Sequence, residues 1–381
     1  MSESLAVAIV HHHLRGGGVT RVIENAIAAL SDFDVEIVVL SGEEPQEHSA
    51  IAGQVSVVDG LRYAKDQQKP QSAELLKAQL KSSAKAALGR LPDVWHVHNH
   101  SLGKNPAVTD AVISMAGEGQ RLLFQLHDFA EDGRPGNYER FLEYGNRNTA
   151  AEGSGPAGRL YPAGDHIHYA LLNGRDARYM KEAGVPGDQI TILSNPVSFE
   201  GDVDDDQPLD LRELVEGSVA ALIEEKKLVL YPTRAIRRKN MGEMLLWSAL
   251  MGEEYLFAAT LAPKNPEMKP VYEQWKAFAG EQGLSVMFEL GLQWEGPFIQ
   301  LLKQAEAMLS TSVMEGFGLA FLEPWLVGRP VVGRNLPDIT RDFSDRGVDL
   351  SHLYATLDIP LDFFDLESLQ GRFKYSFTKL H

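Results

Sequence analysis

The sequence predicts an α/β protein made of two Rossmann-like domains, each built on a doubly wound parallel sheet. Short apolar runs alternate with amphipathic stretches along most of the chain, and one polar, acidic segment interrupts this pattern. The chain of 381 residues is also longer than a domain with a single hydrophobic core usually is. We therefore expect an N-terminal domain at 1–199, an acidic connection at 200–226, and a C-terminal domain at 227–381 that is short at its C-terminus.

The first domain begins with a strand, helix, strand unit. A buried parallel strand is expected at 5–10, a glycine turn at 16–18, an amphipathic helix at 19–30 and a second strand at 35–40. Helical stretches separate the further short strands, which are expected at 94–97, 122–126, 167–172 and 189–193. This order is typical of a doubly wound sheet.

The second domain repeats the same order after the acidic connection. Its strands are expected at 228–231, 256–261, 286–290, 307–310 and 330–332. The connection contains the run Asp204-Asp205-Asp206, which is formally a DxD motif. Its spacing matches no calcium loop and it lies where a linker is expected, so we interpret it as a solvated segment.

Composition excludes several classes of function. The 36 basic and 53 acidic residues give a formal charge of −17, which argues against binding nucleic acid or an anionic membrane. Because the chain has no cysteine, disulfides, thiol nucleophiles and thiolate metal sites are excluded. No apolar run reaches the ~18 residues that span a bilayer, and the N-terminus lacks the features of a signal peptide. A cytoplasmic protein is expected.

A glycine loop follows the first predicted strand. His11-His12-His13 leads into Gly16, Gly17 and Gly18, which directly precede the first predicted helix. Bare N–H groups at the start of a helix favour a phosphate or a reacting centre, which makes Gly17 and Gly18 candidate binding residues. The spacing does not fit the GxGxxG fingerprint of dinucleotide-binding proteins, and a plain tight turn remains the alternative.

A cationic loop follows the first strand of the second domain. Four cations occur in the six residues from Arg234 to Lys239, at the edge where open α/β sheets bind ligands. Guanidinium and ammonium groups neutralise a diphosphate well, so Arg234 and Lys239 are candidate residues for that task. The alternative is a charged surface turn at a helix start, although cations there oppose the helix dipole.

A third motif spans 315–323 and has the sequence EGFGLAFLE. Its two carboxylates, Glu315 and Glu323, are eight positions apart and can accept hydrogen bonds from paired hydroxyls. The glycines between them let the backbone approach a ligand, and free N–H groups where a helix is expected to start near Leu319 favour a diphosphate. Sugar hydroxyls, a diphosphate and ribose hydroxyls together describe a nucleotide-sugar.

Histidines gather at the strand ends of the first domain. His127 directly follows the strand at 122–126, where it can donate to a sugar hydroxyl or steady a leaving group; a structural role is the alternative. Three polar residues are expected in the loop that follows: Asp132, Arg134 and Tyr138. His96, His98 and His100 alternate along one strand face without a carboxylate at ligand spacing. We therefore interpret these three as cleft or packing residues and expect no metal site.

These motifs resemble the retaining glycosyltransferases of the GT-B fold, specifically glycosyltransferase family 4. The resemblance rests on Arg234 with Lys239, on EGFGLAFLE at 315–323 and on GRPVV at 328–332. The glycine loop, His127-Asp128 and Ser194-Asn195-Pro196-Val197 extend it over most of 5–340. It implies two Rossmann-like domains that face a central cleft.

The resemblance also implies a role for each site residue. Glu315 is expected near the donor sugar hydroxyls, Glu323 at the ribose hydroxyls, and Arg234 and Lys239 at the diphosphate. His127 is expected beside the anomeric centre. The remaining expected contacts with the donor come from Gly17 and Gly18 near the phosphate and acceptor, from Gly316, Phe317, Gly318 and Leu319 near the sugar and diphosphate, and from Gly291 within 290–293 beside the base.

The implied function is a retaining hexosyl transfer from a nucleoside-diphosphate sugar to a hydroxyl of a small polar or glycan acceptor, with no metal or other cofactor. The base, the sugar and the acceptor stay open. An epimerase or phosphorylase of the same architecture and a non-catalytic nucleotide-sugar-binding protein are alternatives. A peripheral membrane enzyme is a third, through the lysines of 77–85, but the mostly alanine apolar face of that stretch favours a solvated helix.

Overall fold

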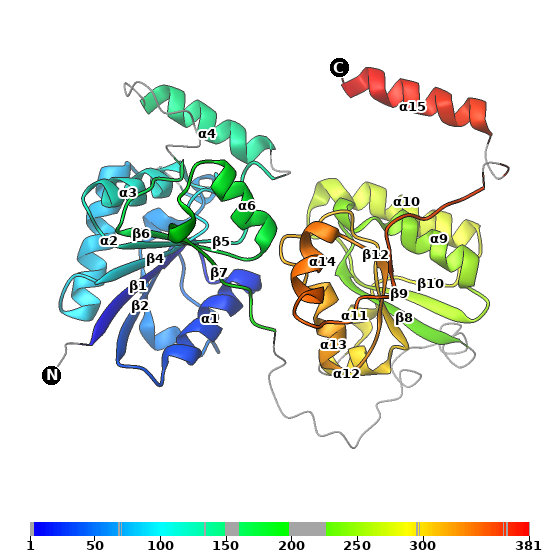
Figure 1. The fold of residues 1–381 in the computed structure, drawn as a ribbon, viewed down its shortest axis with the longest axis horizontal. Helices are drawn as coiled ribbons and strands as arrows, with labels where there is room; N and C mark the ends of the chain where they lie inside the picture. Colours follow the sequence, from blue (N-terminus) through cyan, green and yellow to red (C-terminus); the bar gives the residue numbers. More distant parts are fainter. Residues whose placement is uncertain are drawn as a thin grey trace. The chain divides into compact units, whose positions relative to one another are not determined.

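The computed structural model describes residues 4–67, 69, 71–132, 135–148, 160–197, 226–294, 296, 298–360, 362 and 365–380. The chain divides into two compact units (Figure 1). The first consists of Met1–Ser198 with Gly316–Gly318, and the second of Phe199–Glu315 with Leu319–His381. The predicted connection at 200–226, with Asp204–Asp206, lies outside the described residues except for Lys226, and so does Arg134.

The first unit contains a seven-stranded parallel sheet of order β3-β2-β1-β4-β5-β6-β7. Its strands are β1 (Leu5–His11), β2 (Val35–Ser41), β3 (Val55–Val57), β4 (Val94–His98), β5 (Leu122–Leu126), β6 (Ile167–Leu171) and β7 (Ile190–Ile192). The chain runs outward from β1 in one direction and then in the other, so the strand order reverses between β1 and β4. The predicted doubly wound sheet is confirmed.

Helices cover both faces of this sheet, because strand side chains alternate between the two faces. The helices are α1 (Gly18–Leu30), α2 (Ala73–Leu88), α3 (Pro106–Gly117), α4 (Pro135–Asn148) and α6 (Gly174–Glu182). Ile23 and Ile27 of α1 pack with Val7 and Ile9 of β1. The neighbouring β1 residues on the opposite face join a larger core that includes α2, α3 and α6.

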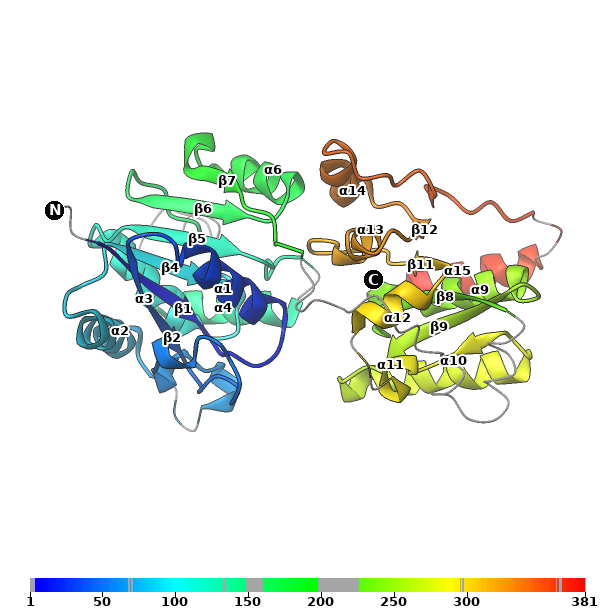
Figure 2. The same cartoon turned by 90° about the horizontal axis from the view of Figure 1, so that it is seen from below.

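The second unit contains a six-stranded parallel sheet of order β10-β9-β8-β11-β12-β13, and Figure 2 shows the fan of strands in each unit. Its strands are β8 (Lys227–Arg234), β9 (Tyr255–Leu261), β10 (Val286–Met287), β11 (Ala307–Ser310), β12 (Val331–Arg334) and β13 (Leu353–Tyr354). Helices α9 (Met241–Met251) and α10 (Lys269–Glu281) pack on one face of the sheet. Helices α11 (Leu290–Gln293) and α12 (Phe298–Gln304) pack on the other face. The remaining helices are α13 (Glu323–Leu326), α14 (Pro337–Ser344) and α15 (Leu366–Leu380).

Two predictions about these elements were wrong, and two short strands were missed. The strand expected at 286–290 ends at Met287, because Glu289 has a positive φ of 64° and helix α11 begins at Leu290. Tyr138 lies in α4 rather than in a loop. The edge strands β3 and β13 were not predicted, since three and two residues are too few to show an alternating pattern.

Helix α2 carries the lysines that suggested membrane binding. Its buried residues are Leu76, Leu80 and Ala84. Lys77 Nζ lies 2.7 Å from a carboxylate oxygen of Glu118, the C-cap residue of α3, and Lys81 pairs with the same carboxylate. The two lysines hold the pKa of Glu118 at about 2. These contacts do not support a membrane role for α2. Among the described residues, none of the helices combines the length and apolarity needed to cross a bilayer.

Candidate functional site

In each sheet, the loops that carry the predicted residues follow strands at the point where the strand order reverses. In the second unit, β8 and β11 are neighbours; Arg234 is the last residue of β8, and the loops after the two strands contain the other cationic residues and Glu315. In the first unit, β1 and β4 are neighbours, and β5 follows β4. Ligands of open α/β sheets bind beyond the carboxyl ends of strands at such a reversal. The topology therefore favours both loop clusters as binding sites.

Hydrogen bonds join the two loops of the second unit. The Val313 N–H donates to the Arg238 carbonyl over 2.9 Å, and the Thr311 hydroxyl donates to the Lys239 carbonyl over 3.0 Å. The buried Tyr231 hydroxyl donates to the same Lys239 carbonyl over 2.9 Å. Burial raises the pKa of Tyr231 to about 12, so it remains a donor near neutral pH. These bonds hold the cationic loop against the loop that leads to Glu315.

The central feature of this cluster is a buried ion pair between Lys239 and Glu315. Lys239 Nζ donates to Glu315 Oε1, the Ser312 hydroxyl donates to the same oxygen over 2.6 Å, and Arg238 Nη1 donates to Glu315 Oε2 over 3.2 Å. Lys239 is 9% exposed and Glu315 is 6% exposed. Burial lowers the pKa of Lys239, whereas Glu315 and then Glu323 act to raise it. The structure thus brings two predicted site residues into direct contact.

The structure places Arg234 differently from Lys239. Its Nη1 donates to the Ala262 carbonyl over 2.8 Å, just beyond the end of β9. Arg238, which the sequence analysis did not select, contacts both Glu315 and the Met314 carbonyl. Ser312 was also missed, although the polar run at 310–312, which begins with the last residue of β11, is a signal that could have indicated it.

The segment from Gly316 to Glu323 does not form the helix expected to start near Leu319. Leu319–Phe321 is a short 3₁₀ turn, and α13 begins only at Glu323. Pro324 has no N–H to donate to the Ala320 carbonyl, so one continuous helix cannot form there. Gly318 has φ 97°, which favours glycine, and Phe317 is buried. Glu323 is half-buried.

Gly291 has a structural reason to be glycine. It lies in α11, and a Cβ there would be only 3.0 Å from the Thr260 carbonyl oxygen. A side chain at this position would therefore require α11 and β9 to separate by a few tenths of an ångström. The predicted role beside a nucleotide base stays a prediction.

The fold does not require glycine at positions 17 and 18. Gly17 is the N-cap of α1 and has extended backbone, φ 174°, which any residue adopts. A Cβ added to Gly17 would have one neighbour within 4 Å, the Arg15 carbonyl oxygen at 3.8 Å. A Cβ on Gly18 would meet no protein atom within 4 Å. No side chain forms a capping hydrogen bond at the start of α1, and the first turn of this helix contains no acidic residue. This helix start is therefore open to an anion.

His127 is held by two residues of the segment at the end of β4. Asn99 Oδ1 accepts from the His127 N–H over 2.7 Å and from the Asp128 N–H over 3.3 Å. His98 Nδ1 lies 2.9 Å from His127 Nε2. His127 is 7% exposed, and burial lowers its pKa to about 4. Asn99 and His98 thus position a neutral imidazole, and Asn99 is a residue that the sequence analysis missed.

The three alternating histidines do not share one strand face. His96 and His98 lie on β4 with ring centroids 4.4 Å apart, but β4 ends at His98. Asn99 has φ 54° and turns the chain, so His100 instead packs on Phe124 with centroids 4.0 Å apart. In the described part of the chain, no group of three or more His, Asp or Glu side chains is arranged to hold a metal ion.

Replacing Asn99 is expected to destabilise the first unit. In Asn99→Ala, two backbone N–H groups lose their acceptor and alanine must adopt a positive φ, so we expect a loss of about 2–4 kcal/mol in the free energy of unfolding. Asn99→Gly removes the same acceptor without the backbone strain and should cost less. Urea unfolding of both variants measures the difference, and equal losses would show that backbone strain is not part of the cost.

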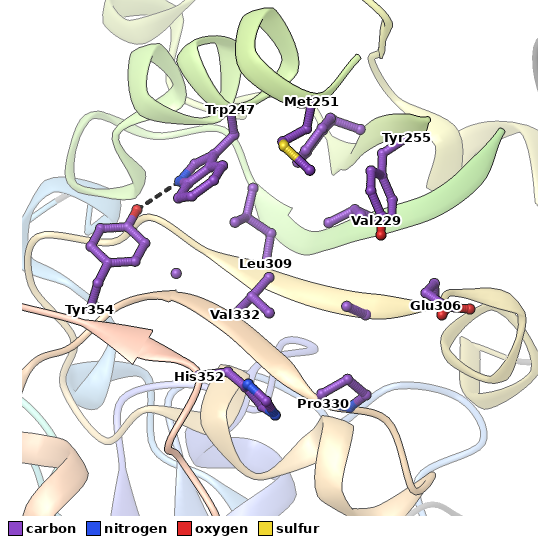
Figure 3. Close-up of a pocket in the computed structure, with 13 residues that line it drawn as sticks. Val229, Trp247, Met251, Tyr255, Glu306, Leu309, Pro330, Val332, His352 and Tyr354 are labelled. Carbon is purple, nitrogen blue, oxygen red and sulfur yellow. Dashed lines mark hydrogen bonds between the residues drawn. The ribbon is translucent and has the colours of Figure 1, made fainter. Parts of the chain in front are cut away.

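The second unit also has an apolar hollow of about 350 Å³ (Figure 3). It lies over β8, β11 and β12 beside α9, and the Trp247 indole N–H donates to the Tyr354 hydroxyl over 2.8 Å at one end. Its lining is mainly aliphatic and aromatic. None of the predicted site residues lines this hollow, so it is separate from the Lys239–Glu315 cluster.

Comparison with known proteins identifies the fold. No protein-family model matches this chain. A mannosylglucosyl-3-phosphoglycerate synthase of Petrotoga mobilis is 27% identical over 348 residues, which cover 88% of this chain. The chain spans 66% of the length of that relative.

Two solved structures show the same architecture. Anabaena Alr3699/HepE in complex with UDP and glucose has a TM-score of 0.56 and 13% identity, covering 87% of this chain and 81% of its own. The catalytic domain of starch synthase IV from Arabidopsis thaliana, bound to ADP and acarbose, has a TM-score of 0.57 and 12% identity, covering 92% and 87%. The predicted GT-B fold is confirmed, as is the resemblance to glycosyltransferases of that fold. Membership of family 4 stays a prediction.

Proposed function

We propose that this chain is a retaining glycosyltransferase that moves a hexose from a nucleoside-diphosphate sugar to a hydroxyl of a small polar or glycan acceptor, without a metal. The observation that carries the proposal is the cluster of Lys239, Arg238 and Glu315 at the carboxyl ends of β8 and β11. Cations and a carboxylate at this point of the sheet suit a ligand with a diphosphate and a sugar. HepE and starch synthase IV, which have this fold, carry UDP and ADP in their structures.

Each proposed role follows from the chemistry of the side chain. Arg234, Arg238 and Lys239 would bind the diphosphate as cations, and Glu315 would accept hydrogen bonds from the sugar hydroxyls. In the structure, Lys239 donates a hydrogen bond to Glu315. Bound diphosphate would attract Lys239 away from Glu315. Hydrogen bonds from the bound sugar hydroxyls would replace part of the interaction that Glu315 then loses.

The other proposed contacts with the donor are assigned to residues of both units. Glu323 would hold the ribose hydroxyls, Gly291 would lie beside the base, and His127 would lie near the anomeric carbon. The remaining backbone contacts are assigned to Gly17, Gly18, Gly316, Phe317, Gly318 and Leu319.

The proposed reaction needs no strong protein base. The bond between the anomeric carbon and the diphosphate oxygen breaks as cations stabilise the departing charge. The acceptor oxygen bonds to the anomeric carbon from the same face, and its proton passes to the departing diphosphate. The sugar therefore keeps its anomeric configuration. The Petrotoga relative has 3-phosphoglycerate in its name, which supports a small phosphorylated acceptor for this chain.

The test is a panel of UDP-, GDP- and ADP-sugars with a metal chelator present. A ligand that binds only the folded protein raises its melting temperature by mass action. We expect one nucleotide class to do so, and NMR of the first product formed to show the donor's anomeric configuration. No stabilisation by any donor would contradict the proposal. Binding without transfer would instead indicate a nucleotide-sugar-binding protein, and the inverted anomer would contradict retention.

Gly18→Ala should weaken ligand binding without destabilising the protein. The added Cβ meets no protein atom within 4 Å, and alanine favours a helix over glycine by about 0.5–1 kcal/mol. A ligand at the start of α1 would be crowded, so we expect a loss of roughly tenfold or more in affinity for the donor or the acceptor. Gly117→Ala in α3, where a Cβ also meets nothing within 4 Å, is the matched control. Calorimetric titration that finds equal affinities in both variants would show that no ligand approaches Gly18.

A further inference from the structure

The hydrogen bond between His98 and His127 is nearly in line with both rings. The two nitrogens are 2.9 Å apart, the ring centroids are 5.2 Å apart, and the ring planes differ by only 12°. The distance between the ring centroids is longer than the distance between the two nitrogens by about two ring radii. The two nitrogens therefore lie on the line that joins the centroids, and the rings point directly at one another. One nitrogen carries the shared proton and the other accepts it. The question is which ring is the donor.

The surroundings of His98 answer this question. Its second nitrogen, Nε2, is buried and has no hydrogen-bond partner. The neighbouring rings are His96, with its centroid at 4.4 Å, and His11, at 5.9 Å in an edge contact. His96 uses its own Nε2 in a 2.9 Å hydrogen bond with Gln125. Because orphaned buried N–H groups are rarer than unsatisfied acceptors, Nε2 of His98 is the bare nitrogen and Nδ1 carries the proton. His98 is therefore the donor, and His127 Nε2 accepts.

We propose that His98 is a positioning residue that fixes His127 in the tautomer protonated on Nδ1. His127 then presents an N–H donor to a ligand and has no free nitrogen with which to act as a base. Among the described residues, none forms a hydrogen bond to this Nδ1. The ligand group that it suits is an oxygen acceptor, such as a hydroxyl or ether oxygen of a sugar. Only this last assignment rests on the proposed function.

The charge state of the pair agrees with this tautomer. Burial lowers the pKa of His127 to about 4 and that of His98 well below its ordinary value. The groups that add to these shifts are other histidines: His96 acts on His127, while His96, His127 and His11 act on His98. Near pH 7 both rings are neutral, so each carries one proton.

Long-range ¹H–¹⁵N correlation on the full chain labelled with ¹⁵N-histidine tests the inference, since the pattern differs between the two tautomers. We expect His127, assigned through the signals lost in His127→Asn, to carry its proton on Nδ1 in the unmodified protein. Protonation on Nε2 would overturn the proposal. This measurement needs neither a ligand nor a variant of His98.

Two variants test the cause. His98→Phe keeps a ring of similar size and removes the donor, so His127 should shift toward protonation on Nε2. His96→Phe is the matched control, because His96 is also buried on β4 but bonds to Gln125, and it should leave the tautomer unchanged. An unchanged tautomer in a folded His98→Phe protein would overturn the positioning role.

Ligand binding separates this inference from the proposed function. If His127 donates to a bound nucleotide-sugar, His98→Phe should weaken that binding roughly three- to tenfold, as expected for one lost hydrogen bond. If no nucleotide-sugar binds to the unmodified protein, the proposed function fails while the tautomer result stands. If a nucleotide-sugar binds equally well to both proteins, His127 does not donate to it, and the assignment of the ligand group is wrong.

Discussion

Lowering the pH from 7 to 5 is expected to destabilise the first unit strongly and the second unit much less. Burial is the largest cause of a lowered pKa at seven described histidines of the first unit: His11, His12, His13, His96, His98, His100 and His127. Four of these pKa values lie at about 4: those of His12, His96, His100 and His127. In the second unit, His352 is the one histidine among the described residues.

The lowered pKa values determine that the first unit loses stability as the pH falls. In the unfolded chain a histidine takes up a proton near pH 6.5, whereas the folded unit excludes that proton until about pH 4. The contribution to stability is complete above pH 6.5 and is lost as the pH falls from there toward 4. Each such histidine costs about 1.4 kcal/mol per pH unit, or about 2 kcal/mol at pH 5. Three of them would already reach the lower end of a typical unfolding free energy of about 5–15 kcal/mol. Among the described acidic side chains of the first unit, Asp176 alone has a pKa that burial raises, and this one group opposes the trend.

Hydrogen exchange, corrected for the intrinsic effect of pH, measures this difference separately in the two units. We expect the amides of β1, β4 and β5 to lose protection between pH 6.5 and 5 while those of β8 and β9 keep theirs. His96→Phe should move the transition to lower pH, and His48→Gln, which changes an exposed histidine, should not. Equal loss in both units would contradict the burial argument.

The fold could be predicted because its signals are local. Each central strand contains a short, mostly apolar segment and is followed by a helical pattern, and β1, β5 and β11 lie within a residue of their expected bounds. The elements that were missed or misplaced lie where the local hydrophobic pattern is weak or where a single residue changes the direction of the backbone. Asn99 and Glu289 adopt positive φ, which ends a strand or starts a helix without any change in hydrophobicity.

The site could be predicted only in part. The types of residue after β5, β8 and β11 indicated where a ligand could bind, because open α/β sheets bind ligands beyond the carboxyl ends of their strands. Their partners could not be predicted. Lys239 and Glu315 are 76 positions apart, and their contact depends on the pairing of β8 with β11 and on the hydrogen bonds that join the loops. The His98–His127 bond similarly depends on the register of β4 and β5.

Lys239→Met is expected to reduce the stability of the second unit by about 3–5 kcal/mol, because it leaves the buried Glu315 without its closest cation. Arg238 and Ser312 still donate to that carboxylate, but Arg238 reaches it over 3.2 Å. Arg234→Met is the matched control. Its side chain donates to the Ala262 carbonyl, so its loss should cost about 1 kcal/mol.

Nucleotide binding then distinguishes a structural lysine from a binding one. If Lys239 and Arg234 both bind the diphosphate, each single variant should bind nucleoside diphosphate more weakly when titrated at a temperature where it is folded. Only Lys239→Met should also unfold earlier in urea. A Lys239→Met protein that binds normally would leave the lysine with a structural role alone.

Adding Glu315→Leu to Lys239→Met should restore stability but not ligand binding. The double variant removes both buried charges, so much of the stability lost in Lys239→Met should return, since replacing a buried ion pair with apolar groups is often neutral or stabilising. Binding of the sugar should not return, because Glu315 is the proposed acceptor for the sugar hydroxyls. Recovery of stability without recovery of binding is the result expected if the pair lies in this cluster to hold a ligand; a double variant no more stable than Lys239→Met would show that the ion pair itself supports the fold.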